Sequence, residues 1–178
     1  VLIANRNGIV FSGSSQTDTR NLVAAAARIS DEQFKANGIH SAKTGDSYAP
    51  SFTDAGGAVR VEAGARISTS TPTSVKQGGG YVLLMGQEVS NAGAITTPRG
   101  QAQLAAGDFF IVRPGQGTAA NQVSTTRGNE VSPQFNADSK VTEHWSFMDV
   151  NDMMKMMPQG MGNMMMDSTH KDTGKMKM

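Results

Sequence analysis

The chain has 178 residues, no cysteine and a formal net charge of +1. Its length suits a single domain. The absence of cysteine excludes a disulfide framework, a thiolate zinc site and a cysteine nucleophile. The balanced charge offers no basic surface for nucleic acid or an anionic membrane, and no stretch approaches the roughly 18 apolar residues of a transmembrane helix. We therefore expect no nucleic-acid partner and no membrane-spanning segment.

Composition points to β structure. Valine outnumbers leucine 13 to 5, and the chain contains 20 glycines. Valine favours strands and glycine favours turns, so the composition predicts an all-β fold with many turns. The chain starts with Val1 inside an apolar run, and it shows no signal peptide. We expect it to be a piece of a longer protein.

The first 40 residues predict a corner and a short helix. The apolar runs at 1–3 and 9–11 flank Asn5–Gly8, which predicts a tight turn with Gly8 at positive φ, because Asn and Gly tolerate that region. Ser30 followed by Gln33 resembles a capping box, with the glutamine reaching back, and predicts a helix over Asp31–Ala36. The run Ala24–Ala27 fits either a helix or a strand.

Residues 41–57 are small and polar, which predicts a loop or an excursion from the main body. Four apolar or alternating runs within 58–112 then predict strands: Ala58–Glu62, Tyr81–Met85, Gln101–Ala105 and Asp108–Val112. Residues 61–69 also resemble residues 89–97, with one residue deleted. From this repeat we expect parallel strands over 58–112 in stacked coils, with Val61 and Val89 at equivalent inward positions and Ile67 and Ile95 likewise. A β-sandwich is the alternative.

The last part of the chain has a different composition, since eleven of the twelve methionines lie between Met148 and Met178. We expect residues 136–178 to be a disordered or loosely helical tail, with Trp145 and Phe147 as a cap over the core. Thioethers are soft ligands that suit Cu(I). The tail therefore carries candidate copper ligands, flanked by His144 and His170: Met153, Met154, Met156, Met157, Met161, Met164, Met165 and Met166.

Other chemistry finds little support in the sequence. His40, His144 and His170 lie far apart in the sequence and suggest no catalytic triad. Gly78–Gly80 is not followed by the Lys-Ser/Thr of a phosphate loop. Acidic residues do not recur with the repeat, which argues against a calcium roll. The acidic residues are also too scattered for a carbohydrate-active enzyme. We expect no enzymatic activity and no cofactor other than the copper of the alternative reading.

Three stretches resemble the secretion domain of filamentous-haemagglutinin-type exoproteins, also called the two-partner secretion or haemagglutination activity domain. They are Val1–Phe11, which is similar to the family's Asn-Pro-Asn-Gly-Ile signature, Asn21–Asp31, and Gly79–Ile95 continuing into Leu104–Asp108. Arg6 stands where the family has proline. The family's upstream Asn-Pro-Asn-Leu turn and its first strands are absent, so residues 1–135 look like a partial domain followed by the Met-rich tail.

The resemblance implies a right-handed parallel β-helix and a role in export. It implies recognition in the periplasm by a cognate outer-membrane transporter of a Gram-negative cell, followed by folding at the surface that nucleates the rest of an adhesin, haemolysin or contact-dependent toxin carrier. The full-length exoprotein would then meet host or neighbouring cells, as a virulence factor does. The recognition turn would comprise Asn5, Arg6, Asn7, Gly8 and Ile9. The alternative function is an extracytoplasmic copper protein that acts through its tail.

Overall fold

The computed structural model describes residues 1–74, 78–114 and 129–137, all of which belong to one compact unit, Val1–Ser139. These residues form mostly β-strands and one short helix. None of their helices is both long and apolar enough to cross a bilayer. The predictions for Trp145, Phe147 and all the candidate copper ligands concern residues outside the described ranges.

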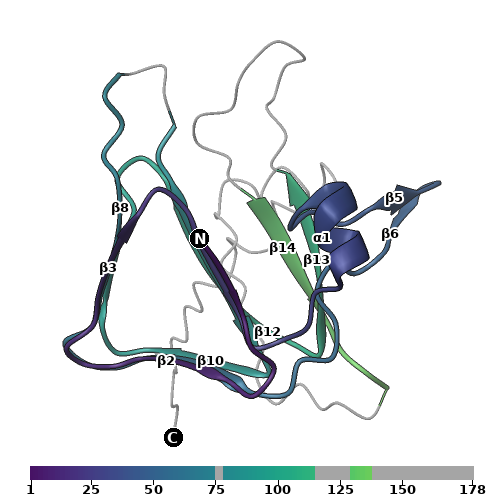
Figure 1. Ribbon diagram of the computed structural model, residues 1–178, viewed down its shortest axis with the longest axis horizontal. Helices are drawn as coiled ribbons and strands as arrows, with labels where there is room; N and C mark the ends of the chain where they lie inside the picture. The colour runs from purple at the N-terminus through teal and green to yellow at the C-terminus, as the bar shows by residue number, and fades with distance from the viewer. Residues whose placement is uncertain (75–77, 115–128, 138–178) are drawn as a thin grey trace, which may run out of the picture. The chain divides into compact units, whose positions relative to one another are not determined.

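Three parallel sheets, here named A, B and C, form the body of the unit and appear as the sides of a triangle in Figure 1. Sheet A contains β1 (Leu2–Ala4), β4 (Leu22–Ala25), β9 (Tyr81–Gly86) and β12 (Gln101–Ala106). Sheet B contains β2 (Ile9–Phe11), β7 (Ala58–Val61) and β10 (Glu88–Asn91). Sheet C contains β3 (Gln16–Thr19), β8 (Arg66–Thr69) and β11 (Ala94–Thr96).

The chain runs through sheets B, C and A in turn, and it repeats this circuit so that each strand pairs in parallel with its counterpart in the next circuit. We call one circuit a coil: β2–β3–β4 is coil 1, β7–β8–β9 is coil 2 and β10–β11–β12 is coil 3. The arrangement confirms the prediction of parallel strands in stacked coils for β7 to β12. It is compatible with a β-helix.

The pairing register confirms one predicted repeat position and corrects the other. Ile95 lies beside Ile67, as predicted. Val89, however, lies beside Val59, and Asn91 takes the place beside Val61. The corner at 62–65 is two residues longer than the corner at 92–93, whereas the predicted pairs Val61–Val89 and Ile67–Ile95 both lie 28 residues apart and allow for no net difference in corner length. Because side chains alternate with period two, a shift of two still leaves Val89 on the inward face.

The interior of the coils is a continuous apolar core. Its buried side chains come from all three sheets and include Ile9, Phe11, Leu22, Ala24, Val59, Val61, Ile67, Val82 and Leu84, with Val89 and Ile95 partly buried against them. The run of alanines predicted as helix or strand begins as strand β4, where small inward residues suit the confined interior. Every residue of β4 is buried, because sheet A has a second core on its outer face.

That second core is covered by an antiparallel hairpin of β13 (Phe109–Pro114) and β14 (Asn129–Gln134) and by Phe52. In Figure 1 the hairpin lies outside the triangle, against sheet A. The prediction that the run to residue 112 is parallel is therefore wrong for β13. Alternating apolar residues bury one face of a strand whatever its direction, and here Phe110 and Val112 pack on Leu83 and Met85 of sheet A.

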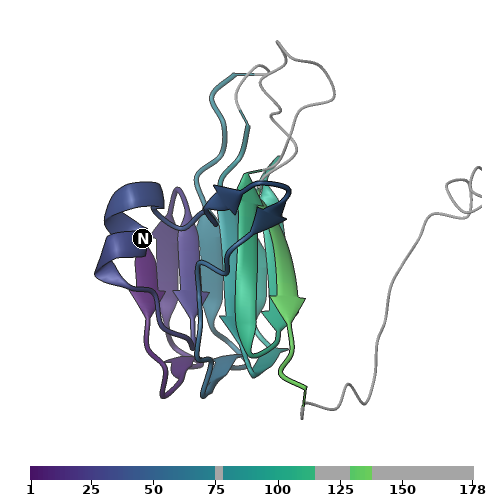
Figure 2. The ribbon, with the colours of Figure 1, turned by 90° about the vertical axis from the view of Figure 1, so that its right-hand side faces the viewer.

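The segment between coils 1 and 2, here called the excursion, begins with α1 (Asp31–Asn37), which was predicted as a helix over Asp31–Ala36. It continues through residues 41–57, the predicted loop or excursion, which contain β5 (Lys43–Thr44) and β6 (Ser47–Tyr48). Figure 2 shows α1 and this small hairpin over the outer side of sheet A. Ser30 is the helix cap, as predicted, since its Oγ accepts the Gln33 N–H at 3.1 Å. Gln33 does not reach back to the cap. Its amide instead donates to the carbonyl of His40 at 2.6 Å.

A polar network joins the excursion, sheet A and the hairpin. The Gln101 side chain pairs with the backbone of Asn129 in both directions, at 2.6 and 2.7 Å. His40 Nε2 lies 2.7 Å from Asn129 Oδ1. Burial raises the pKa of the nearby Tyr81, which a hydrogen bond from Asn129 opposes in part. The network thus occupies the edge of β14 that faces β12.

We expect the partly buried Tyr81 to make the folded domain less stable at alkaline pH. Because the pKa is raised by folding, this tyrosine contributes stability below its unfolded value of about 10, and the contribution is lost as pH rises towards the folded value. Urea unfolding of the parent and of Tyr81→Phe at increasing pH measures it. The parent should lose stability relative to the variant above about pH 10, and parallel pH curves would contradict the expectation.

Candidate functional site

The predicted turn at Asn5–Gly8 is present between β1 and β2. The Gly8 N–H donates to the Asn5 carbonyl at 3.0 Å, and the Asn7 N–H donates to the Asn5 side-chain oxygen at 3.1 Å. Gly8 has φ of 120°, which confirms the predicted positive φ. The Asn5 contact is an Asx-turn, in which a side chain replaces a backbone acceptor.

The five predicted recognition residues divide into an exposed and an anchored group. Asn5, Arg6 and Asn7 are exposed. Ile9 is buried in the inner core in register with Val59 of the next coil. Gly8 lies between them, and a Cβ there would stand 3.1 Å from the Ala58 carbonyl. The turn therefore presents polar side chains from a backbone that is held by the first two coils.

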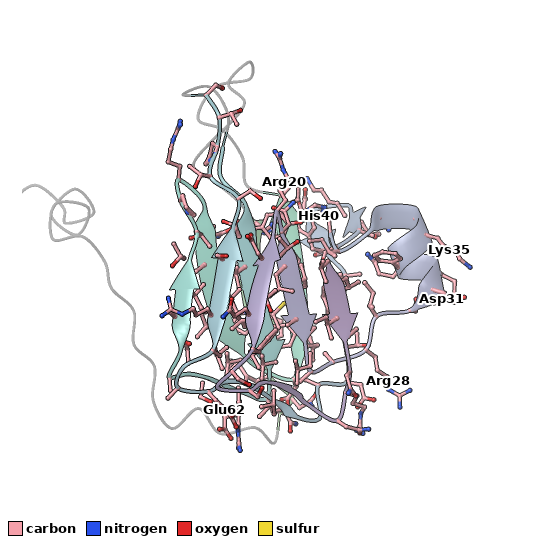
Figure 3. All side chains as sticks on the ribbon, turned by 60° about the vertical axis from the view of Figure 1, so that its left-hand side comes forward. Arg20, Arg28, Asp31, Lys35, His40 and Glu62 are labelled. Atoms are coloured by element: carbon pink, nitrogen blue, oxygen red, sulfur yellow. The ribbon has the colours of Figure 1, made fainter. Side chains whose placement is uncertain are left out.

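An ion cluster beside the turn was not predicted. Arg6 Nε lies 2.7 Å from Asp54 Oδ2, and Arg28 Nε lies 2.9 Å from the same oxygen. Asp54 has φ of 53°, an uncommon value for a residue with a side chain. Figure 3 shows Arg28 projecting from the lower edge of the coils. Arg6 belongs to the turn, Arg28 follows β4, and Asp54 lies shortly before β7, so no local sequence signal connects them.

An open hollow of about 610 Å³ lies between the turn and the start of the excursion. Arg6 and Arg28 are the charged residues that line it, and Asn5 and Asn7 contribute amides. Ala4, Ala27 and Ile29 supply apolar surface. No group of three metal-ligating His, Asp or Glu side chains occurs among residues 1–74, 78–114 and 129–137. The geometry suits the binding of polar or anionic groups.

Comparison with known protein families shows to which family the chain belongs. The family model described as the TPS secretion domain matches residues 1–161. The chain belongs to this family. The resemblance noted in the sequence is therefore confirmed, and the TPS domain match extends over most of the chain. No curated protein and no solved structure matches the chain.

The TPS secretion domain is a secretion module of two-partner exoproteins. Because the chain belongs to this family, it is part of a secreted or cell-surface exoprotein that a Gram-negative two-partner system exports. It also implies a cognate outer-membrane transporter as partner. The copper-binding alternative gains no support from these findings.

Proposed function

We propose that the TPS domain turn at Asn5–Ile9 is the part of this chain that its transporter recognises in the periplasm. The observation that carries the proposal is the division within the turn. Three consecutive exposed side chains, Asn5–Asn7, precede Gly8 and the buried Ile9. The hydrogen bonds of the turn join residues two and three positions apart, so the turn needs no stacked coils to form, and a segment with this local order loses less conformational freedom when the transporter binds it.

We further propose that the coils form a right-handed parallel β-helix that nucleates folding at the cell surface. Leu2 of β1 pairs with Val23, whereas Ile9 of β2 pairs with Val59. These separations are 21 and 50 residues, so closing the first loop costs about 0.8 kcal/mol less entropy. Pairing of β1 with β4 is therefore the less costly step and precedes the pairing of β2 with coil 2, and each later coil stacks on a completed one. Stacking outside the cell would oppose back-sliding of the chain.

Replacement of Asn5 by alanine tests the recognition role. The variant loses the acceptor for the Asn7 N–H, so we expect the turn to lose its order and export to fall severalfold. The measurement is the secreted fraction of the complete exoprotein when it is expressed with its transporter. Asn91→Ala is the matched control, because Asn91 Oδ1 accepts the Gly93 N–H at the same distance of 3.1 Å in another corner.

Both variants remove one side-chain to backbone hydrogen bond, which is worth about 1 kcal/mol in each case. Equal losses of stability in the two purified variants would establish that the pair is matched. A fall in export for Asn5→Ala alone then reports recognition. Equal export of the two variants would refute the recognition role of this turn.

A further inference from the structure

The chain contains two Asn-Gly pairs, and each is followed by isoleucine, in Asn7–Ile9 and in Asn37–Ile39. An asparagine before glycine is chemically labile, because glycine has no side chain to hinder attack by its own backbone nitrogen. Asn7 and Asn37 are both exposed. The shared local sequence gives the two asparagines the same intrinsic reactivity in an unfolded chain, so a difference between them in the folded domain comes from the structure.

The reaction is deamidation, which exchanges the side-chain amide for a carboxylate. The Gly8 nitrogen loses its proton to water and attacks Asn7 Cγ. The new C–N bond closes a succinimide ring, and Nδ2 takes up a proton and leaves as ammonia. Water then opens the ring at either carbonyl, which yields aspartate or isoaspartate. In isoaspartate the main chain runs through the former side chain, so the backbone is longer by one carbon atom.

In the folded domain the peptide group between Asn7 and Gly8 is held against coil 2. The Gly8 N–H donates to the Asn5 carbonyl, so the attacking nitrogen is occupied. A Cβ at Gly57 would stand 2.6 Å from both the Asn7 carbonyl carbon and the Gly8 nitrogen. Ring closure requires this peptide group to leave both contacts. A single hydrogen bond shifts such an opening by only about fivefold, so the larger protection comes from the stacked backbone at Gly57.

The second pair has no such cover. Gly38 follows the last residue of α1, a helix with no buried residue, and its N–H donates to the Phe34 carbonyl at 2.9 Å. A Cβ at Gly38 would find nothing within 4 Å. The end of a short exposed helix opens easily. Folding therefore shields Asn37 through one hydrogen bond, and a longer backbone has room there.

We propose that Asn7 is a site of spontaneous deamidation in the unfolded chain, that stacking of coils 1 and 2 protects it, and that its isoaspartate form does not stack. The added backbone atom would enter the contact with Gly57, where even a methyl group does not fit. Deamidation at Asn7 thus converts time spent unfolded into an irreversible loss of folding competence. Under the proposed function the coils fold at the cell surface, so a chain delayed before export accumulates this damage; that consequence alone rests on the proposed function.

Mass spectrometry of proteolytic peptides from the purified full chain, separated by liquid chromatography, tests the protection. In urea at mildly alkaline pH, Asn7 and Asn37 should deamidate at equal rates. In native buffer at the same pH, folding should slow the reaction at Asn7 at least about a hundredfold, because the coils must separate first. It should slow the reaction at Asn37 by no more than about fivefold. Equal protection of the two sites would overturn the role of coil stacking.

Refolding of chains aged in urea tests the block on stacking. The refolded fraction, isolated by size-exclusion chromatography, should be depleted about tenfold in isoaspartate at position 7 relative to the aged sample, whereas isoaspartate at position 37 should be retained. Asn7→Gln should still refold after ageing, and the matched control Asn37→Gln should lose this capacity as the parent does.

Undiminished isoaspartate at position 7 in the refolded fraction would refute the block, and deamidation at Asn37 alone in urea would refute the site. These assays contain no transporter, so they fail independently of the export test. Normal refolding of deamidated chains removes this inference alone, and equal export of Asn5→Ala and Asn91→Ala removes the recognition function alone.

Discussion

Replacement of Leu84 by alanine is expected to destabilise the domain by about 2–5 kcal/mol. Leu84 is fully buried in the inner core and lies between Ala24 of β4 and Leu104 of β12 in the sheet register. Its strand is hydrogen-bonded on both sides, so the backbone is not free to collapse into the cavity. Urea unfolding of parent and variant, followed by circular dichroism, measures the loss.

Leu104→Ala provides the control at the equivalent inward position of coil 3. Leu104 is 43% exposed, so truncation removes less buried area and leaves no closed cavity. We expect it to cost less than half as much as Leu84→Ala. Equal costs would contradict the assignment of Leu84 to the centre of the core and Leu104 to its margin.

The features that were predicted correctly depend on neighbours in the sequence. The positive φ of Gly8 follows from the residues of one turn, and the Ser30 cap follows from one helix start. Strand positions such as Ile67 beside Ile95 follow from a repeat that local alternation makes visible. The turn and the cap are each contained in a few consecutive residues, and the repeat becomes visible when two short segments are compared, so none of these predictions needed the packing of the coils.

The errors arose where distant segments decide the outcome. Val89 was paired with the wrong valine because corner length is set by how coils stack, and the repeat alone does not show where residues are inserted. The direction of β13 depends on the outer face of sheet A, which the sequence does not distinguish from the inner face. The Gln33 side chain donates a hydrogen bond to the His40 carbonyl, and not to the helix cap, because the excursion folds back on the helix.

The candidate site shows the same limit. Its turn was predicted from five consecutive residues, but the hollow beside it was not. Asp54 lies 48 positions after Arg6 and 26 after Arg28, and these separations carry no motif. Only the return of the excursion to coil 1 brings the three charges together, where Arg28 and Thr53 form an isolated antiparallel bridge.

Gly64→Ala is the second substitution for which we expect a large effect, a loss of roughly 2–6 kcal/mol. Gly64 lies at the corner between β7 and β8 with φ of 91°, and a Cβ there would stand 2.5 Å from the Gly13 carbonyl oxygen. The side chain of Glu62, labelled in Figure 3, also crosses between these corners, since it accepts the Gly13 N–H at 3.1 Å. The corners of coils 1 and 2 therefore have no room for an added methyl group.

Two control variants separate the backbone strain at positive φ from the crowding by the added Cβ. Gly45→Ala adds a methyl group at φ of 61° with nothing within 4 Å, so it reports backbone strain alone, about 1–2 kcal/mol. Gly13→Ala has no positive φ but would place its Cβ 2.5 Å from the Ala63 carbonyl oxygen, so it reports crowding alone. Because Gly13 and Gly64 crowd the same pair of corners, the double variant should lose less stability than the two single losses added together. If urea unfolding shows that Gly64→Ala costs no more than Gly45→Ala, the close stacking of these corners is refuted.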